Sequence, residues 1–108
     1  IGVPVQDGRI DVIIRGAAPG SVLEVAWSAE AIARIAAPTG SVFTYAEGRV
    51  EVDASVGGLR VELPRAASAA TVDVDGRVYV ERSAAGVVVH EPVVEGTDDV
   101  IRFIITAP

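Results

Sequence analysis

Few side chains in this sequence could carry out catalysis. The only histidine, His90, precedes Glu91, and serines are the available nucleophiles. None of the serines lies in a nucleophile-elbow pattern such as G-x-S-x-G. A histidine without a recognisable catalytic motif is more often a surface or strand-end residue. We therefore expect a protein that is not an enzyme, with no serine or carboxylate close to His90 in a cleft.

Two acidic clusters could bind a hard cation. The first, Asp73-Val74-Asp75-Gly76, resembles the opening of a calcium loop, but the later ligands of such a loop are missing. The second cluster is Glu95-Gly96-Thr97-Asp98-Asp99. Acidic loops in an acidic protein commonly serve solubility, so no metal or other cofactor is predicted. The weak candidate positions for an ion are Asp73, Asp75, Glu95, Asp98 and Asp99.

Three aromatic residues could form a binding platform for sugars. Trp27 and Tyr45 alternate with apolar residues of their own strands, which favours packing in the core. Tyr79 is predicted to point outward beside Thr71, so it is the aromatic candidate for a ligand contact. No glycine-rich loop precedes a helix, and a nucleotide cofactor is therefore not supported.

Composition limits the classes of partner. The chain has 108 residues and a net charge of −6, and all nine of its basic residues are arginines. Scattered arginines in an acidic chain form no basic stripe, so neither nucleic acid nor an anionic membrane surface is an expected partner. No apolar run is long enough to span a membrane. The sequence begins at Ile1, and we expect residues 1–108 to be one domain of a longer chain.

The dominant hydrophobic period is two, which is typical of strands with one buried face. The motif Gly-Arg followed by Ile or Val occurs three times, each time after an acidic residue, at Gly8, Gly48 and Gly76. Two of these sites predict hairpins with two-residue loops that keep apolar residues on one face. The predicted pairs are Val5 with Ile10, Val3 with Val12, Tyr45 with Val50, and Phe43 with Val52.

The third copy of the motif predicts a bulged hairpin. With Val74-Asp75-Gly76 as a three-residue loop and Gly76 at positive φ, Asp73 pairs with Arg77 and Val72 pairs with Val78. A further loop at Gly57-Gly58 pairs Val52 with Leu63, so that residues 42–63 form a three-stranded meander with Asp53 opposite Glu62.

The remaining segments complete an all-β fold. Strands are expected at 21–28, 87–89 and 100–106, and residues 28–38 suit either a strand or a helix, with strand preferred. About eight to ten short strands with closely spaced turns predict a small antiparallel sandwich or a jelly-roll-like barrel.

The sequence phrases GSVLEVAWSAEA, FTYAEGRVEVDAS and LRVELPRAASAATVDVDGRVY follow one another between about residues 9 and 82. In this order they resemble the extracytoplasmic C-terminal β-rich region of bacterial membrane-anchored anti-sigma factors. The resemblance implies a periplasmic or cell-surface location. The cytoplasmic zinc finger and the transmembrane helix of that family are absent from this sequence, and no functional residue is carried over. The contact with a sigma factor would lie outside these residues.

Three functional hypotheses follow. The first is a non-enzymatic extracytoplasmic interaction or scaffold domain of a membrane-tethered bacterial regulator. The second is a carbohydrate-binding or adhesin-like β-module, which requires an exposed aromatic row or a metal. The third is a small esterase-like enzyme, which requires His90 close to a serine and a carboxylate.

The strand edges of the chain have little protection against pairing with another strand. Lysine is absent and proline is scarce within the strand runs, although both commonly prevent edge pairing. Consecutive apolar residues at Val87-Val88-Val89 and Ile104-Ile105 cannot all face one core. We expect association through a sheet edge or an apolar face, with either another copy or the remainder of the parent protein.

Overall fold

The structure is a computed structural model that describes residues 1–53, 58–97 and 99–106. This part of the chain contains no helix, and hence none long and apolar enough to cross a membrane. It contains more strands than the eight to ten expected. The twelve strands are β1 (Gly2–Pro4), β2 (Arg9–Arg15), β3 (Val22–Ser28), β4 (Ile32–Ala36), β5 (Val42–Ala46), β6 (Arg49–Asp53), β7 (Leu59–Pro64), β8 (Ala69–Val74), β9 (Arg77–Ser83), β10 (Gly86–Val89), β11 (Glu95–Gly96) and β12 (Val100–Ile104).

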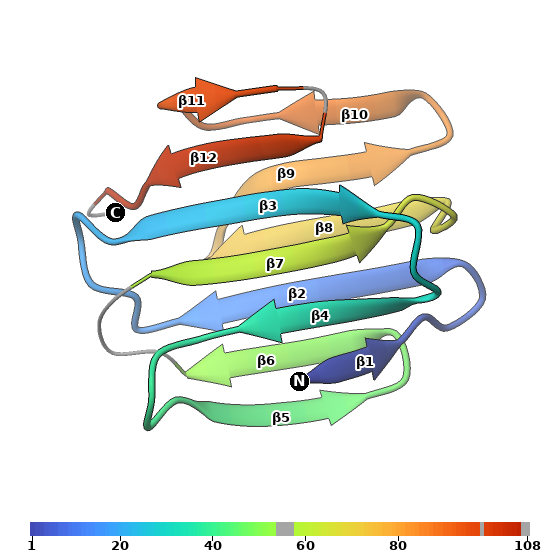
Figure 1. Cartoon of the computed structure of the whole chain (residues 1–108), viewed down its shortest axis with the longest axis horizontal. Coiled ribbons are helices and arrows are strands. Elements are labelled where there is room, and N and C mark those ends of the chain that lie inside the picture. The colour runs from blue at the N-terminus through green and yellow to red at the C-terminus, as the bar shows by residue number, and fades with distance from the viewer. Residues whose placement is uncertain (54–57, 98, 107–108) are drawn as a thin grey trace.

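The strands form two six-stranded sheets that pack face to face (Figure 1). The sheet nearer the viewer, here called the front sheet, has the order β1-β4-β7-β3-β12-β11. The back sheet has the order β10-β9-β8-β2-β6-β5. The predicted all-β sandwich is confirmed, and the alternative of a closed barrel is not what the chain forms.

Both sheets are mixed, whereas the sequence predicted antiparallel sheets. In the back sheet β2 lies between β6 and β8 and runs parallel to both. In the front sheet β3 runs parallel to β7. A tight hairpin cannot join parallel neighbours. After β6 the chain crosses to the opposite sheet as β7 and then returns to the back sheet as β8, on the other side of β2. The earlier strand β2 is thereby held between two strands that come later in the chain.

The core lies between the sheets and is built from the alternating apolar positions of the strands. In β2 the side chains of Ile10, Val12 and Ile14 are fully buried, and the residues between them are not. The same alternation buries Leu23 and Val25 of β3. Hydrophobic burial of this kind is the main favourable contribution to folding, so the period of two seen in the sequence does identify the buried faces.

The first two hairpin loops have the predicted residues, but only one has the predicted partners. The loop Asp7-Gly8 is closed by hydrogen bonds between Gln6 and Arg9, and both loop residues have positive φ. Beyond this turn, β1 leaves for the front sheet, where Val3 pairs with Ala33 rather than with Val12. The predicted pairs Val5–Ile10 and Val3–Val12 were therefore wrong.

The hairpin at Glu47-Gly48 is confirmed residue by residue. Tyr45 pairs with Val50 and Phe43 pairs with Val52 across β5 and β6. The predicted continuation into a meander was wrong, because β7 belongs to the other sheet, where Glu62 lies opposite Arg34 and not opposite Asp53. Any two alternating strands satisfy the face test, so that test could not select the true neighbour. The loop residues 54–57 lie outside the described residues.

The hairpin between β8 and β9 has a two-residue loop, not the predicted three-residue loop. Val74 pairs with Arg77, and the loop residues Asp75 and Gly76 have φ of 50° and 87°. The positive φ of Gly76 is confirmed, and the predicted pairs Asp73–Arg77 and Val72–Val78 were wrong. The register shifts between Val72 and Asp73, so a bulge does exist, but it lies within β9.

The ambiguous segment 28–38 forms a strand, β4, as preferred from the sequence. The strands expected near 21–28, 87–89 and 100–106 are present as β3, β10 and β12.

Candidate interaction edges

His90 lies on the surface at the end of β10. Its Nε2 atom lies 3.1 Å from Oε2 of Glu81, and both side chains are close to half exposed. A carboxylate is therefore within reach of the histidine, on an open surface rather than in a cleft. Among the hydrogen bonds of the described residues, none joins His90 to a serine. Within residues 1–53, 58–97 and 99–106, the hydrogen bonds do not bring a serine together with His90 and Glu81.

The first acidic cluster is used by the backbone around the β8–β9 turn. Oδ1 of Asp73 accepts a hydrogen bond of 2.9 Å from the Gly76 amide, and Oδ1 of Asp75 accepts one of 2.8 Å from the Gly16 amide. Short polar side chains that accept bonds from neighbouring backbone amides stabilise turns. Asp73 therefore caps the turn, whereas Asp75 joins the turn to the end of β2.

The second acidic cluster is paired with arginines. Glu95 lies 3.2 Å from Arg102, and Asp99 forms an ion pair with Arg65. Asp98 lies outside the described residues. Among the residues that the structure describes, no three His, Asp or Glu side chains gather in a way that could hold a metal ion.

Tyr79 was predicted to face solvent, and this was wrong. It is 1% exposed and packs edge-on against Phe103 of the opposite sheet, with ring centroids 5.3 Å apart. The bulge in β9 is the cause, because an extra residue reverses the alternation of faces. As a result the consecutive residues Tyr79 and Val80 are both buried. Tyr79 is therefore removed as a ligand contact.

The other two aromatic candidates differ from each other. Trp27 is partly buried, and the guanidinium of Arg82 lies over its ring at 4.9 Å from the centroid. Tyr45 was predicted to pack in the core but is 58% exposed. The three aromatic residues therefore do not form the exposed row that a carbohydrate-binding module needs.

The outer face of the front sheet has a row of alternating charges. Glu95, Arg102, Glu24 and Arg60 lie opposite one another on neighbouring strands, and each arginine forms an ion pair with Glu24. The row borders a shallow depression of about 440 Å³, with Leu59 among its lining residues. Both arginines there already have carboxylate partners, so the depression offers a ligand no unpaired charge.

The sandwich has two lateral edges, each formed by the outermost strands of the two sheets, and these edges differ in structure. We call the side formed by β10 and β11 the closed edge. There the chain passes from one sheet to the other between β10 and β11 (Figure 1). Backbone hydrogen bonds hold both ends of this crossing segment. The His90 amide donates to the Tyr79 carbonyl, and the Val94 amide donates to the Arg102 carbonyl.

Side-chain hydrogen bonds also connect segments of the chain near the closed edge. Arg77 of β9 donates to Glu91 at 2.6 Å and to Thr106 at 3.0 Å. The Glu91 side chain is only 12% exposed. These contacts join the back sheet to the crossing segment and to the residues after β12. Val87 and Val88 of β10 are nevertheless exposed, as is Ile104 of β12.

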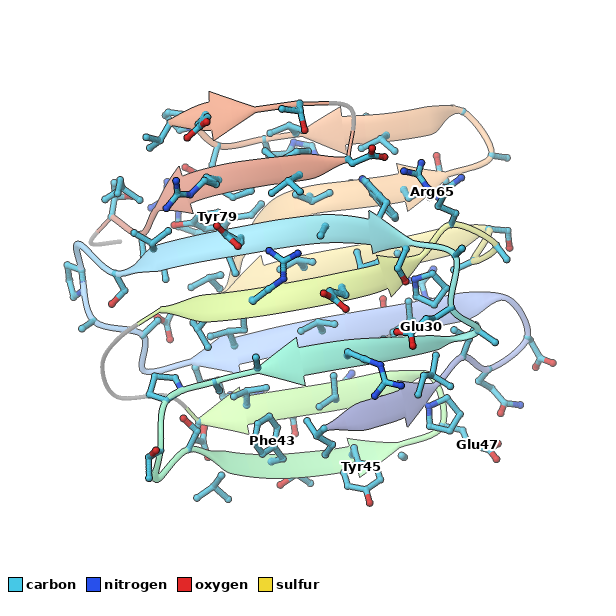
Figure 2. The ribbon with its side chains drawn as sticks, viewed as in Figure 1. Glu30, Phe43, Tyr45, Glu47, Arg65 and Tyr79 are labelled. Carbon is cyan, nitrogen blue, oxygen red and sulfur yellow. The ribbon has the colours of Figure 1, made fainter. Side chains whose placement is uncertain are left out.

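We call the side formed by β5 and β1 the open edge. β5 is the last strand of the back sheet, and β1, which is only three residues long, is the last strand of the front sheet. Phe43 and Tyr45 lie on the inner face of β5, because their ladder partners Val52 and Val50 are fully buried. Figure 2 shows both rings at this edge of the molecule. Phe43 packs against the core, whereas Tyr45 is mostly exposed.

β5 lacks the features that usually keep an edge strand from pairing. Between Val42 and Ala46 it has no charged residue and no proline, and its register with β6 is unbroken. Of the other edge strands, β1 contains Pro4 and β11 has only two residues, whereas β10 (GVVV) also has no charged residue and no proline and pairs with β9 without a break. β5 differs from β10 in its exposed aromatic side chain, Tyr45. The sequence reasoning missed β5 as the exposed edge. A sequence signal was present: on the outer face, where neighbouring strands carry charged residues, the only polar residue of β5 is Thr44.

Comparisons with known proteins give no further guidance: no family model, no curated protein and no solved structure matches the chain.

Proposed function

We propose that this domain is a non-enzymatic protein-interaction module that binds a protein partner by adding a strand to β5 at the open edge. One observation carries the proposal. Tyr45 is 58% exposed although Val50, its ladder partner on the same face, is fully buried. The apolar inner layer of the back sheet thus extends one strand beyond the part that the front sheet covers.

Strand addition is a common mode of protein recognition, because the backbone of an edge strand offers unpaired donors and acceptors while the side chains provide specificity. At the open edge the backbone of β5 supplies the unpaired donors and acceptors. The exposed side chains of Val42 and Tyr45 provide the specificity, since both would lose contact with water when a strand pairs with β5.

The biological setting that we propose is the extracytoplasmic part of a membrane-tethered bacterial regulator. Its support is the resemblance of residues 9–82 to anti-sigma factors. The test is the full-length gene and its neighbours: an upstream zinc-finger segment, a membrane helix and an adjacent sigma-factor gene are expected. A full-length gene without these features would contradict the proposed setting but not the proposal that a partner strand pairs with β5.

Site-specific photocrosslinking tests the interaction edge. A photoreactive phenylalanine derivative is placed at Tyr45 in one variant and at Val88 in a matched control, since both positions are exposed edge residues. In the cell that produces the protein, we expect a discrete adduct from position 45 and none of that mass from position 88. Adducts from position 88 alone, or none from position 45, would contradict the proposed function. Mass spectrometry of the adduct identifies the partner.

A further inference from the structure

We propose that the strand added to β5 is β5 of a second copy of this chain, in an antiparallel pair related by a two-fold axis that passes beside Thr44. The inference rests on the proposed function of the open edge and names the partner. Three features of β5 support it: the direction of its backbone groups, the symmetry of its side chains and the distribution of charge around it.

The backbone of β5 has its free hydrogen-bonding groups where this register needs them. In a hairpin with a two-residue loop, the residues that flank the loop exchange hydrogen bonds, and here these are Ala46 and Arg49. Backbone groups alternate in direction along a strand. The amides and carbonyls of Phe43 and Tyr45 therefore point away from β6, toward the place of an added strand.

An antiparallel pair centred on Thr44 puts Phe43 of one copy opposite Tyr45 of the other. Both residues have free groups directed outward, so each can donate to and accept from its counterpart. Thr44 then lies opposite its own copy at a position that does not exchange hydrogen bonds, which is the required alternation. A register displaced by one residue would place inner-face residues against outer-face residues and is excluded.

The side chains of β5 are symmetric in type about Thr44. The order is aliphatic, aromatic, Thr, aromatic, aliphatic, from Val42 to Ala46. A two-fold interface requires a surface that complements itself, and this order provides one. On the inner face the pair Phe43–Tyr45 occurs twice, so that the apolar layer continues from one sandwich to the next, with aromatic pairs across the junction.

The charges beside β5 also suit this register. Val42 pairs with Asp53 and Ala46 pairs with Arg49 in the ladder to β6. Since Val42 of one copy would face Ala46 of the other, each such row has Asp53 at one end and Arg49 at the other. The central row contains Glu51 of both copies, but each Glu51 is paired with Arg15 and Arg49 of its own chain. A partner strand pointing in the parallel direction would instead align Asp53 with Asp53.

The dimer is expected to be weak, because one pair of short strands buries less than the roughly 1,200 Å² of a stable interface. Each copy has a net charge of −6, so the two repel at long range. Added salt screens this repulsion. The dissociation constant of the native chain should therefore fall as the salt concentration rises.

Charge substitutions at the two-fold axis test the register. Thr44 is exposed, so Thr44→Lys and Thr44→Glu should fold as the native chain does. In either variant alone, two like charges meet at the axis, and sedimentation analysis should show the dissociation constant raised about fivefold or more. An equimolar mixture of the two variants should form a heterodimer that is tighter than the dimer of either variant alone, because a lysine at position 44 of one chain then meets a glutamate at position 44 of the other.

Val88→Lys and Val88→Glu are the matched controls on β10 and should leave the dimer of the native chain unchanged. Loss of the dimer in these controls, but not in the Thr44 variants, would overturn the proposal. So would a native chain that stays monomeric at about millimolar concentration, or Thr44 variants that weaken the dimer without restoring it on mixing. In these cases the crosslink from position 45 distinguishes the dimer from the proposed function. An adduct with a different protein would contradict the dimer and leave the proposed function standing. No adduct from position 45 would contradict both.

Discussion

Two tyrosines at opposite edges of the sandwich show how burial is decided in this fold. Tyr79 on β9, next to the closed edge, and Tyr45 on β5, at the open edge, both lie on the inner face of the back sheet, yet one is 1% exposed and the other 58%. The difference lies in the opposite layer. Phe103 of β12 covers Tyr79, whereas the front sheet ends at the short strand β1 before it covers Tyr45. An apolar face is core only where a second sheet meets it.

The largest expected effect comes from shortening each tyrosine in turn. Tyr79→Ala should lower the free energy of unfolding by about 3–5 kcal/mol, because it leaves a cavity in the core. Tyr45→Ala should change it by less than about 0.5 kcal/mol in dilute solution, as exposed substitutions usually do. Urea unfolding measures both. Tyr79→Phe keeps the ring and serves as the control for a general effect of substitution at this site; equal costs at positions 79 and 45 would contradict the distinction between the edges.

The ion pair at the closed edge should contribute less than the tyrosine but more than a surface pair. Glu91→Gln removes the charge that Arg77 contacts at 2.6 Å in a largely buried place, and we expect a loss of about 1–2 kcal/mol. The matched control is Glu30→Gln, which breaks a solvent-exposed pair with Arg34 and should cost clearly less than Glu91→Gln, because water screens exposed charges. Thermal or urea unfolding compares the two variants, and equal losses would show that the closed edge gains nothing from its partial burial.

Hydrogen exchange should distinguish the two edges without any substitution. In dilute solution the amides of Phe43 and Tyr45 are expected to exchange quickly, because no strand accepts their hydrogen bonds. The Thr44 amide is directed toward β6 and should exchange more slowly. As the protein concentration rises, protection should appear at Phe43 and Tyr45, while the amides of β10 stay as they were. A concentration-dependent change confined to β10 would reverse the assignment of the edges.

The smallest expected effect is a pH dependence at the open edge. Arg15 donates a hydrogen bond to Glu51, and this bond, with a further one from Arg49, holds the pKa of the Glu51 carboxyl below its ordinary value. A carboxyl whose pKa is lowered by folding stabilises the folded state above its ordinary pKa, about 4.3, and loses this contribution as the pH falls through its folded pKa. Unfolding curves of the native chain and of Glu51→Gln should therefore differ slightly at neutral pH and converge in acid. A difference that grows in acid would contradict this sign.

Sequence alone was sufficient for the local features of the fold. The period of two located the strands, and it identified the apolar faces of Ile10, Val12, Val50 and Val52, all of which are fully buried. Turn chemistry identified the loop Glu47-Gly48 with its full register and the positive φ of Gly76. These features depend on residues within a few positions of one another, so the pattern of a short segment contains the information.

Tertiary structure decided which strands are neighbours and which faces are covered. Val3 pairs across to the front sheet, and β2 lies between β6 and β8, because chain segments far apart in sequence meet there. Alternation shows that a strand has an apolar face but not which strand lies beside it, since every alternating strand meets the same condition. The short front sheet that exposes Tyr45 depends on these distant pairings, and the burial of Tyr79 depends on Phe103 of the opposite sheet, which lies against its ring. The sequence predicted the opposite for each tyrosine, because a side chain becomes buried only through the layer that packs against it.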